Sequence, residues 1–120
     1  MEIQKLQDVV ILRLRSSDLT DTHKTAAILE DLLKVDGERK FVADLSAVQA
    51  IASLQAGAIV TMHLLCYENL AVMKLAGVHE RVKDVLRLIG LDQLMEIHHG
   101  AEVARSSFGA PRGPKEPPTE

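Results

Sequence analysis

Few side chains in this sequence could do chemistry, and Ser53 is the one placed most suggestively. The stretch DLSAVQAIASLQAG, residues 44–57, carries it from an apolar, strand-like run into a helix-like run. A serine at a helix start can act as a nucleophile, accept a phosphate or cap the helix. The segment IASLQ lacks the G-x-S-x-G elbow of a nucleophilic serine, and no base is identifiable. Two roles therefore remain for Ser53, a helix cap and a phosphate acceptor.

The spacing of the histidines and of the single cysteine does not predict a metal site. The histidines are His23, His63, His79, His98 and His99. No two of them have the i, i+4 spacing of a zinc site on a helix, and the chain has no second cysteine. Cys66 follows Leu65 on the apolar side of a predicted helix, where cysteine usually acts as a small, unreactive hydrophobe.

Phosphate-binding glycine loops are also missing, since neither G-x-x-x-x-G-K nor G-x-G-x-x-G occurs. We therefore expect no enzyme, no metal and no cofactor.

Composition limits the class of protein further. The 120 residues are enough for one domain, and a net charge of −3 gives no basic surface for nucleic acid. The apolar runs are shorter than the about 20 residues of a membrane-spanning helix, and the N-terminus does not resemble a signal peptide. With one cysteine, these features favour a cytoplasmic protein without membrane insertion.

The hydrophobic pattern predicts an α/β fold. Strands are expected over 2–6, 9–14, 40–45, 71–75 and 94–98, and helices between 20 and 37 and over 53–67, 79–90 and 100–108. Gly37 and Gly90 are expected to end two of these helices. The buried stripe of the helix over 53–67 is predicted to be Leu54, Ala58, Ile59, Met62, Leu65 and Cys66.

This order predicts one small mixed sheet of about five strands flanked by about four helices, parallel at its centre. Residues 1–108 form the predicted domain. The segment 109–120, which contains all four prolines, is predicted to be disordered.

Two segments resemble the STAS domain of anti-sigma-factor antagonists. The first, FVADLSAVQAIASLQAG, contains Asp44, Leu45 and Ser46, which match the strand-ending Asp-Leu-Ser of that family. The second, LAVMKLAGVHERVKDVLRLIGLDQLMEI, matches the later strand, helix and Gly-Leu turn. Its matching positions are Gly77, Val82, Val85, Leu86, Gly90, Leu91, Leu94 and Ile97. The resemblance covers about residues 3–106.

The resemblance implies a partner-switching protein in transcription regulation. In its unmodified form such a domain binds an anti-sigma factor that is a serine-protein kinase, and phosphorylation at the helix start breaks the complex. Ser53 aligns with the phosphorylated serine. The implied partner-binding residues are Asp44, Ser46, Ser53, Leu54 and Gln55.

The segment around Ser53 departs from the family pattern. Ala52, Leu54 and Gln55 stand where the family has an acidic residue, a Ser or Thr, and a glycine. These departures leave an alternative open, a non-phosphorylated STAS scaffold subunit of a stressosome-like or transporter-associated assembly. A homodimer or a larger STAS assembly is compatible with either reading. Asp44 and Ser46 also suit a plain turn-forming role after the strand.

Overall fold

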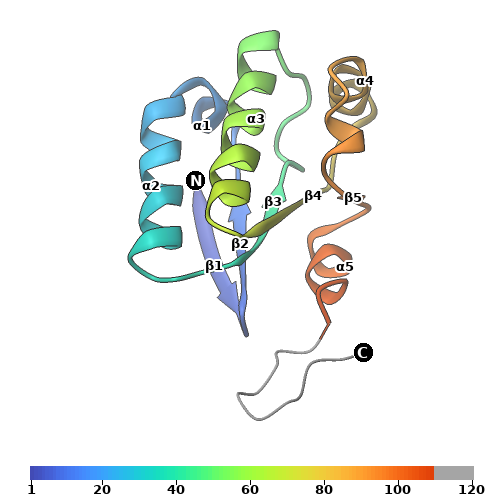
Figure 1. Cartoon of the computed structure of the whole chain (residues 1–120). Helices are drawn as coiled ribbons and strands as arrows, with labels where there is room; N and C mark the ends of the chain where they lie inside the picture. The colour runs from blue at the N-terminus through green and yellow to red at the C-terminus, as the bar shows by residue number, and fades with distance from the viewer. Residues whose placement is uncertain (110–120) are drawn as a thin grey trace.

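The computed structural model describes residues 1–109 and contains one five-stranded mixed sheet covered by helices (Figure 1). The strands are β1 (Glu2–Leu6), β2 (Val9–Arg13), β3 (Lys40–Asp44), β4 (Val72–Ala76) and β5 (Ile97–His98), in that order across the sheet. The helices are α1 (Ser16–Thr20), α2 (Thr22–Lys34), α3 (Ser53–Glu68), α4 (Glu80–Leu88) and α5 (Ala101–Ser106), with a 3-10 turn η1 (Leu91–Gln93). The predicted fold class is confirmed. The predicted disordered tail lies outside the described residues except for Gly109.

The sheet is antiparallel at one edge and parallel elsewhere, as its sequence order requires. Strands β1 and β2 form a hairpin whose turn residue Gln7 has a left-handed φ of 58°. Each later strand follows a helix and pairs in parallel with its predecessor, because a helical crossover returns the chain to the same end of the sheet. All parallel strands therefore bring their carboxyl ends to one edge.

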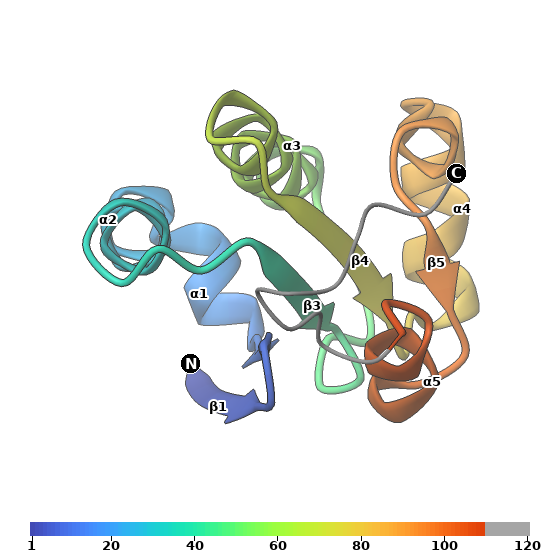
Figure 2. The same cartoon turned by 60° about the horizontal axis from the view of Figure 1, so that its bottom comes forward.

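One face of the sheet carries the main core. Helices α1, α2, α3 and α4 lie on this face, and Figure 2 shows α3 between α2 and α4. Alternate strand residues point into this core: Val10, Leu12, Phe41, Ala43, Met73 and Leu75. Helix α3 contributes Ala58, Ile59, Met62 and Cys66 to it. The packing of α3 on the sheet fixes where its first turn lies.

The opposite face is smaller and is covered by α5. Val9, Ile11, Val42, Ala76 and Ala104 form its apolar cluster. Lys74 is buried beside them at 7% exposure, with its Nζ 2.7 Å from the Ser107 hydroxyl and 4.2 Å from the Phe108 ring centroid. Glu96 lies 3.4 Å from the same ammonium group. A buried ammonium needs such partners, so Lys74 fixes α5 to the sheet.

Helix ends follow the predicted signals in part. Asp21 caps α2 by accepting a hydrogen bond from the amide of Lys24 at 3.2 Å. Gly37 and Gly90 adopt left-handed φ values of 71° and 76° after α2 and α4, as predicted. Helix α1 is a short addition to the four predicted helices. None of the helices in residues 1–109 is long and apolar enough to span a membrane.

Candidate functional site

The loop from β3 to α3 is fixed at its first residues by Asp44. The Asp44 carboxylate accepts a hydrogen bond from the amide of Ser46 at 2.9 Å and lies 3.7 Å from the Arg13 guanidinium. Val48, fully buried, anchors the middle of the loop in the core. Asp44 is 9% exposed, so it organises this turn and offers little surface to another molecule.

Gly77 and His79 hold the other side of the same turn. A Cβ on Gly77 would lie 3.0 Å from both Asp44 Oδ1 and Ser46 Cβ, so only glycine lets these two loops meet. His79 Nε2 lies 2.9 Å from the carbonyl oxygen of Ser46 and links the turn to the start of α4. A hollow of about 550 Å³ opens beside this contact. Its lining includes Ser46, Gly77, His79, Lys83, His98 and His99.

Helix α3 begins without the serine cap that the sequence suggested. Ala52 is the N-cap residue, with extended backbone (φ −88°, ψ 163°), and Ser53 is the first helical residue. The prediction that Ser53 caps the helix is wrong by one position. Ala52 has no side-chain acceptor, and the first turn has no acidic residue, so the positive end of the α3 dipole faces outward.

Gln55 takes over part of the missing capping. Its Oε1 accepts a hydrogen bond from the amide of Ala52 at 2.9 Å. Its Nε2 donates to the carbonyl oxygen of Ser16 at 3.2 Å and to the hydroxyl oxygen of Thr20 at 3.3 Å. One side chain thus closes the first turn of α3 and ties it to α1, which holds Ser53 and Leu54 in one position.

Ser53 and Leu54 form an exposed, uncharged tip. Ser53 is exposed, and its hydroxyl makes no hydrogen bond to another of residues 1–109. Leu54 is 72% exposed, which corrects its predicted place on the buried stripe of this helix. A free hydroxyl beside an exposed leucine suits contact with another protein, because the leucine gains from burial and the hydroxyl can accept a covalent charge.

The structure separates the five predicted site residues into two groups. Asp44 and Ser46 lie together at the carboxyl ends of the strands, and Ser53, Leu54 and Gln55 form the helix start. Their role in partner binding stays a prediction. Sequence reasoning missed that His79 contacts Ser46 and that Gln55 reaches α1. A glutamine three residues after the cap position signals the bond to the Ala52 amide, and no local signal points to the contact with α1.

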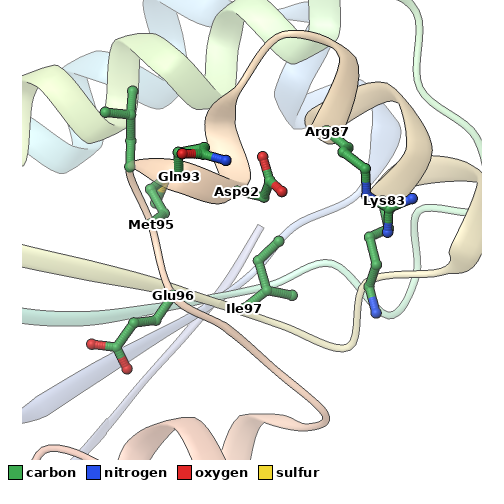
Figure 3. Close-up of a pocket in the computed structure, with 8 residues that line it drawn as sticks. Lys83, Arg87, Asp92, Gln93, Met95, Glu96 and Ile97 are labelled. Atoms are coloured by element: carbon green, nitrogen blue, oxygen red, sulfur yellow. The ribbon is translucent and has the colours of Figure 1, made fainter.

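A second hollow, of about 430 Å³, lies between α4, η1 and β5 and contains none of the predicted site residues (Figure 3). Its charged side chains have mixed signs: Lys83, Arg87, Asp92 and Glu96. Within residues 1–109, no group of three or more His, Cys, Asp or Glu side chains could hold a metal ion.

Cys66 does not add a reactive group. Its side chain is 1% exposed, and burial raises the pKa of its thiol to about 12. Hence it stays a neutral thiol at physiological pH, as its place on the apolar stripe predicts.

Residues 1–104 match the family model of the STAS domain, and the chain belongs to the STAS family. Its mixed sheet and helix order are those of that family, and the resemblance recognised from the sequence is confirmed. Among curated proteins, no sequence matches this chain significantly.

Solved structures with the same fold come from proteins of different roles. A protein from Thermotoga maritima assigned as an anti-sigma factor antagonist is 24% identical, with a TM-score of 0.73 over 88% of this chain and 92% of that chain. A chain from the molecular architecture of the stressosome is 18% identical, with a TM-score of 0.79 over 89% and 95%. A sulfate transporter family protein from Wolinella succinogenes is 18% identical, with a TM-score of 0.67 over 86% and 88%. At these identities the likeness establishes the fold alone.

Proposed function

We propose that this chain is an anti-sigma-factor antagonist that binds an anti-sigma factor of the serine-kinase class through the start of α3. In this proposal the kinase phosphorylates Ser53, and the phosphate breaks the complex. Such a partner places the activity in the cytoplasm and in transcription regulation. The chain itself contributes no catalysis, only a surface that exists in two charge states.

The observation that carries this proposal is the exposed Ser53–Leu54 tip held by Gln55. Because Gln55 fixes the first turn to α1, a partner meets a preorganised surface and loses less entropy on binding. A phosphate on Ser53 would carry about −1.5 to −2 charges. It would lie at the uncapped positive end of α3, so the modified domain stays folded while a surface that fits a neutral hydroxyl rejects it.

The decisive experiment is phosphorylation by the serine-kinase anti-sigma factors of the same organism. The wild-type chain is incubated with ATP and each kinase, and its intact mass is measured beside those of Ser53→Ala and Ser46→Ala. We expect one added phosphate on the wild type and on Ser46→Ala, and none on Ser53→Ala. An unmodified wild-type chain with every kinase would refute the phosphorylation step.

Binding is measured separately, because partner choice and phosphorylation can fail independently. Titration of the unmodified chain into the kinase should give a complex that Ser53→Asp weakens at least tenfold. Ala50→Asp is the matched control, since it adds the same charge to an exposed residue of the same loop that is not among the predicted partner-binding residues. Equal weakening by both variants would contradict a site centred on Ser53.

A second candidate is a STAS scaffold subunit that is never phosphorylated. Ala52, Leu54 and Gln55 favour it, since they replace the acidic, hydroxyl and glycine residues around the family's phosphorylation site. The stressosome chain of the same fold supports this class too. Size-exclusion chromatography separates the candidates: a scaffold runs far above the 13.2 kDa of one chain, and a switch domain runs as a monomer or dimer.

A further inference from the structure

The outer face of α3 carries exposed apolar side chains and no charged residue before Glu68. Charged residues make up 26% of the chain, yet residues 45–67 contain no Asp, Glu, Lys or Arg. Leu54, Leu64 and Tyr67 of this helix are 72%, 49% and 71% exposed. A helix that is apolar on its outer side as well as its inner side normally contacts a second surface there.

Gly57 lies in the middle of this outer face, where neither backbone conformation nor a close contact within residues 1–109 requires a glycine. Its φ is not left-handed, and a Cβ built on it meets no atom within 4 Å. Glycine inside a helix lowers helix stability relative to alanine. A glycine at such a position leaves room for another backbone or side chain to approach closely, and no described residue does so.

The outer residues are self-complementary about the middle of the helix. Since α3 runs from 53 to 68, its midpoint falls between Val60 and Thr61. A two-fold axis there pairs Gly57 of one copy with Leu64 of the second copy, so that a large side chain meets a vacancy at both ends. The same axis pairs Leu54 of one copy with Tyr67 of the second copy.

Charge favours the same antiparallel arrangement. Glu68 lies in the last turn of α3, where a carboxylate opposes the negative end of the helix dipole, and no salt bridge within residues 1–109 compensates it. In the antiparallel pair Glu68 lies beside Ser53 of the second copy. That helix start has no acidic residue in its first turn, so each carboxylate meets a positive helix end.

We propose that this chain forms a symmetric homodimer through antiparallel packing of α3 on α3 of a second copy, with Leu64 of each copy seated against Gly57 of the other. The dimer covers Ser53 and Leu54 and therefore excludes any other partner at that tip. It does not depend on the proposed function, because it concerns the chain alone.

The size of the face sets the expected strength of the dimer. A helix of 16 residues is about 24 Å long and 10 Å wide, so its outer face covers on the order of 250 Å². Stable interfaces bury about 800 Å² on each side. We therefore expect a weak dimer whose population rises with concentration over the micromolar to millimolar range.

The test is sedimentation velocity of the full chain over that range. The wild type should shift from one 13.2 kDa chain to twice that mass as concentration rises. Gly57→Leu fills the vacancy and should lower the association constant at least tenfold. The same variant should raise the melting temperature of the monomer, because leucine favours a helix more than glycine does.

A size swap tests the pairing itself. Gly57→Leu combined with Leu64→Ala moves the large side chain to the other position, and association should return to within about threefold of the wild type. Leu88→Ala is the matched control, since Leu88 on α4 is 86% exposed and lies off this face. It should leave association unchanged.

Two results would overturn the proposal. One is a wild-type chain that stays monomeric at every concentration, which would show that α3 does not pair with α3 of a second copy. The other is a dimer that Gly57→Leu leaves intact, which would place the contact elsewhere. Neither depends on a kinase, so either can occur whether or not Ser53 is phosphorylated.

Discussion

Helices α2 and α3 lie side by side on one face of the sheet (Figure 2) and differ in their N-terminal caps and in the charge of their outer faces. Helix α2 begins with a carboxylate cap from Asp21, and its outer side carries charges such as the Lys34–Glu30 ion pair at 3.3 Å. Helix α3 begins at Ser53 after the N-cap residue Ala52, whose side chain makes no cap hydrogen bond, and it has no charged residue before Glu68 in its last turn. Helix α2 therefore satisfies its first amides and its outer charges with residues of its own segment. The start of α3 depends on the contact of Gln55 with α1.

Breaking the contact that completes the start of α3 should have the largest effect. Gln55→Gly removes the hydrogen bonds to Ala52, Ser16 and Thr20 and adds a glycine to the first turn. We expect a loss of about 2 kcal/mol in the free energy of unfolding, measured by urea denaturation.

Gln55→Glu is the matched control for that change. It keeps an oxygen that accepts from the Ala52 amide and loses the donor to Ser16 and Thr20, so about half of the loss should remain. If both variants unfold at the same urea concentration as the wild type, Gln55 does not hold the two helices together.

Removing the cap of α2 should have the next largest effect on the free energy of unfolding and should not change self-association. Asp21→Ala takes away the acceptor for the Lys24 amide, which should cost about 1 kcal/mol of unfolding free energy. Thermal unfolding followed by circular dichroism measures this. A change in self-association of this variant would contradict this prediction, because it would show that the start of α2 also affects contact between two copies.

Giving α3 the cap that it lacks should stabilise the chain. Ala52 already has the extended backbone of an N-cap residue, so Ala52→Asp should raise the free energy of unfolding by about 0.5–1 kcal/mol. The new carboxylate neutralises the positive helix end, so dimer formation measured by sedimentation should decrease. Ala50→Asp is the control, because it adds the same charge to the exposed loop before the cap. It should leave stability unchanged.

The smallest effect is expected at the other end of α3. Glu68→Gln removes a negative charge from the last turn and should stabilise the monomer by about 0.5 kcal/mol. The same change removes the charge that faces the second helix in the dimer, so association should weaken. Stability and association moving in the same direction would contradict the antiparallel arrangement.

Most of the fold was predictable, because it rests on local signals. The apolar runs over β2, β3 and β4 and the glycines after α2 and α4 are visible in the sequence and appear where expected. Helix α1 was missed because SSDLT reads equally well as the lead-in to α2. Its only buried residue is Leu19, which gives no periodic pattern.

The candidate site was less predictable, because it depends on angles and on distant contacts. Leu54 shares its spacing with the buried stripe of α3, but this stripe runs through Ala58 and Met62, and Leu54 lies off its axis at the solvent edge. The predicted cap at Ser53 was wrong by one residue, because a serine is compatible with the first helical turn as well as with the N-cap position. The contact of Gln55 with α1 spans residues far apart in sequence, which no local pattern encodes.

The buried ammonium of Lys74 bears on where the folded domain ends. The family match ends at residue 104, but the hydroxyl and the ring that satisfy this ammonium belong to Ser107 and Phe108. A chain cut at 104 would lose the Ser107 and Phe108 contacts that attach α5 to the sheet at Lys74, and only the Glu96 carboxylate, at 3.4 Å, would stay beside the ammonium. We therefore predict that the folding unit extends past the residues that match the family model, and truncations intended to isolate this domain should retain residues through 108.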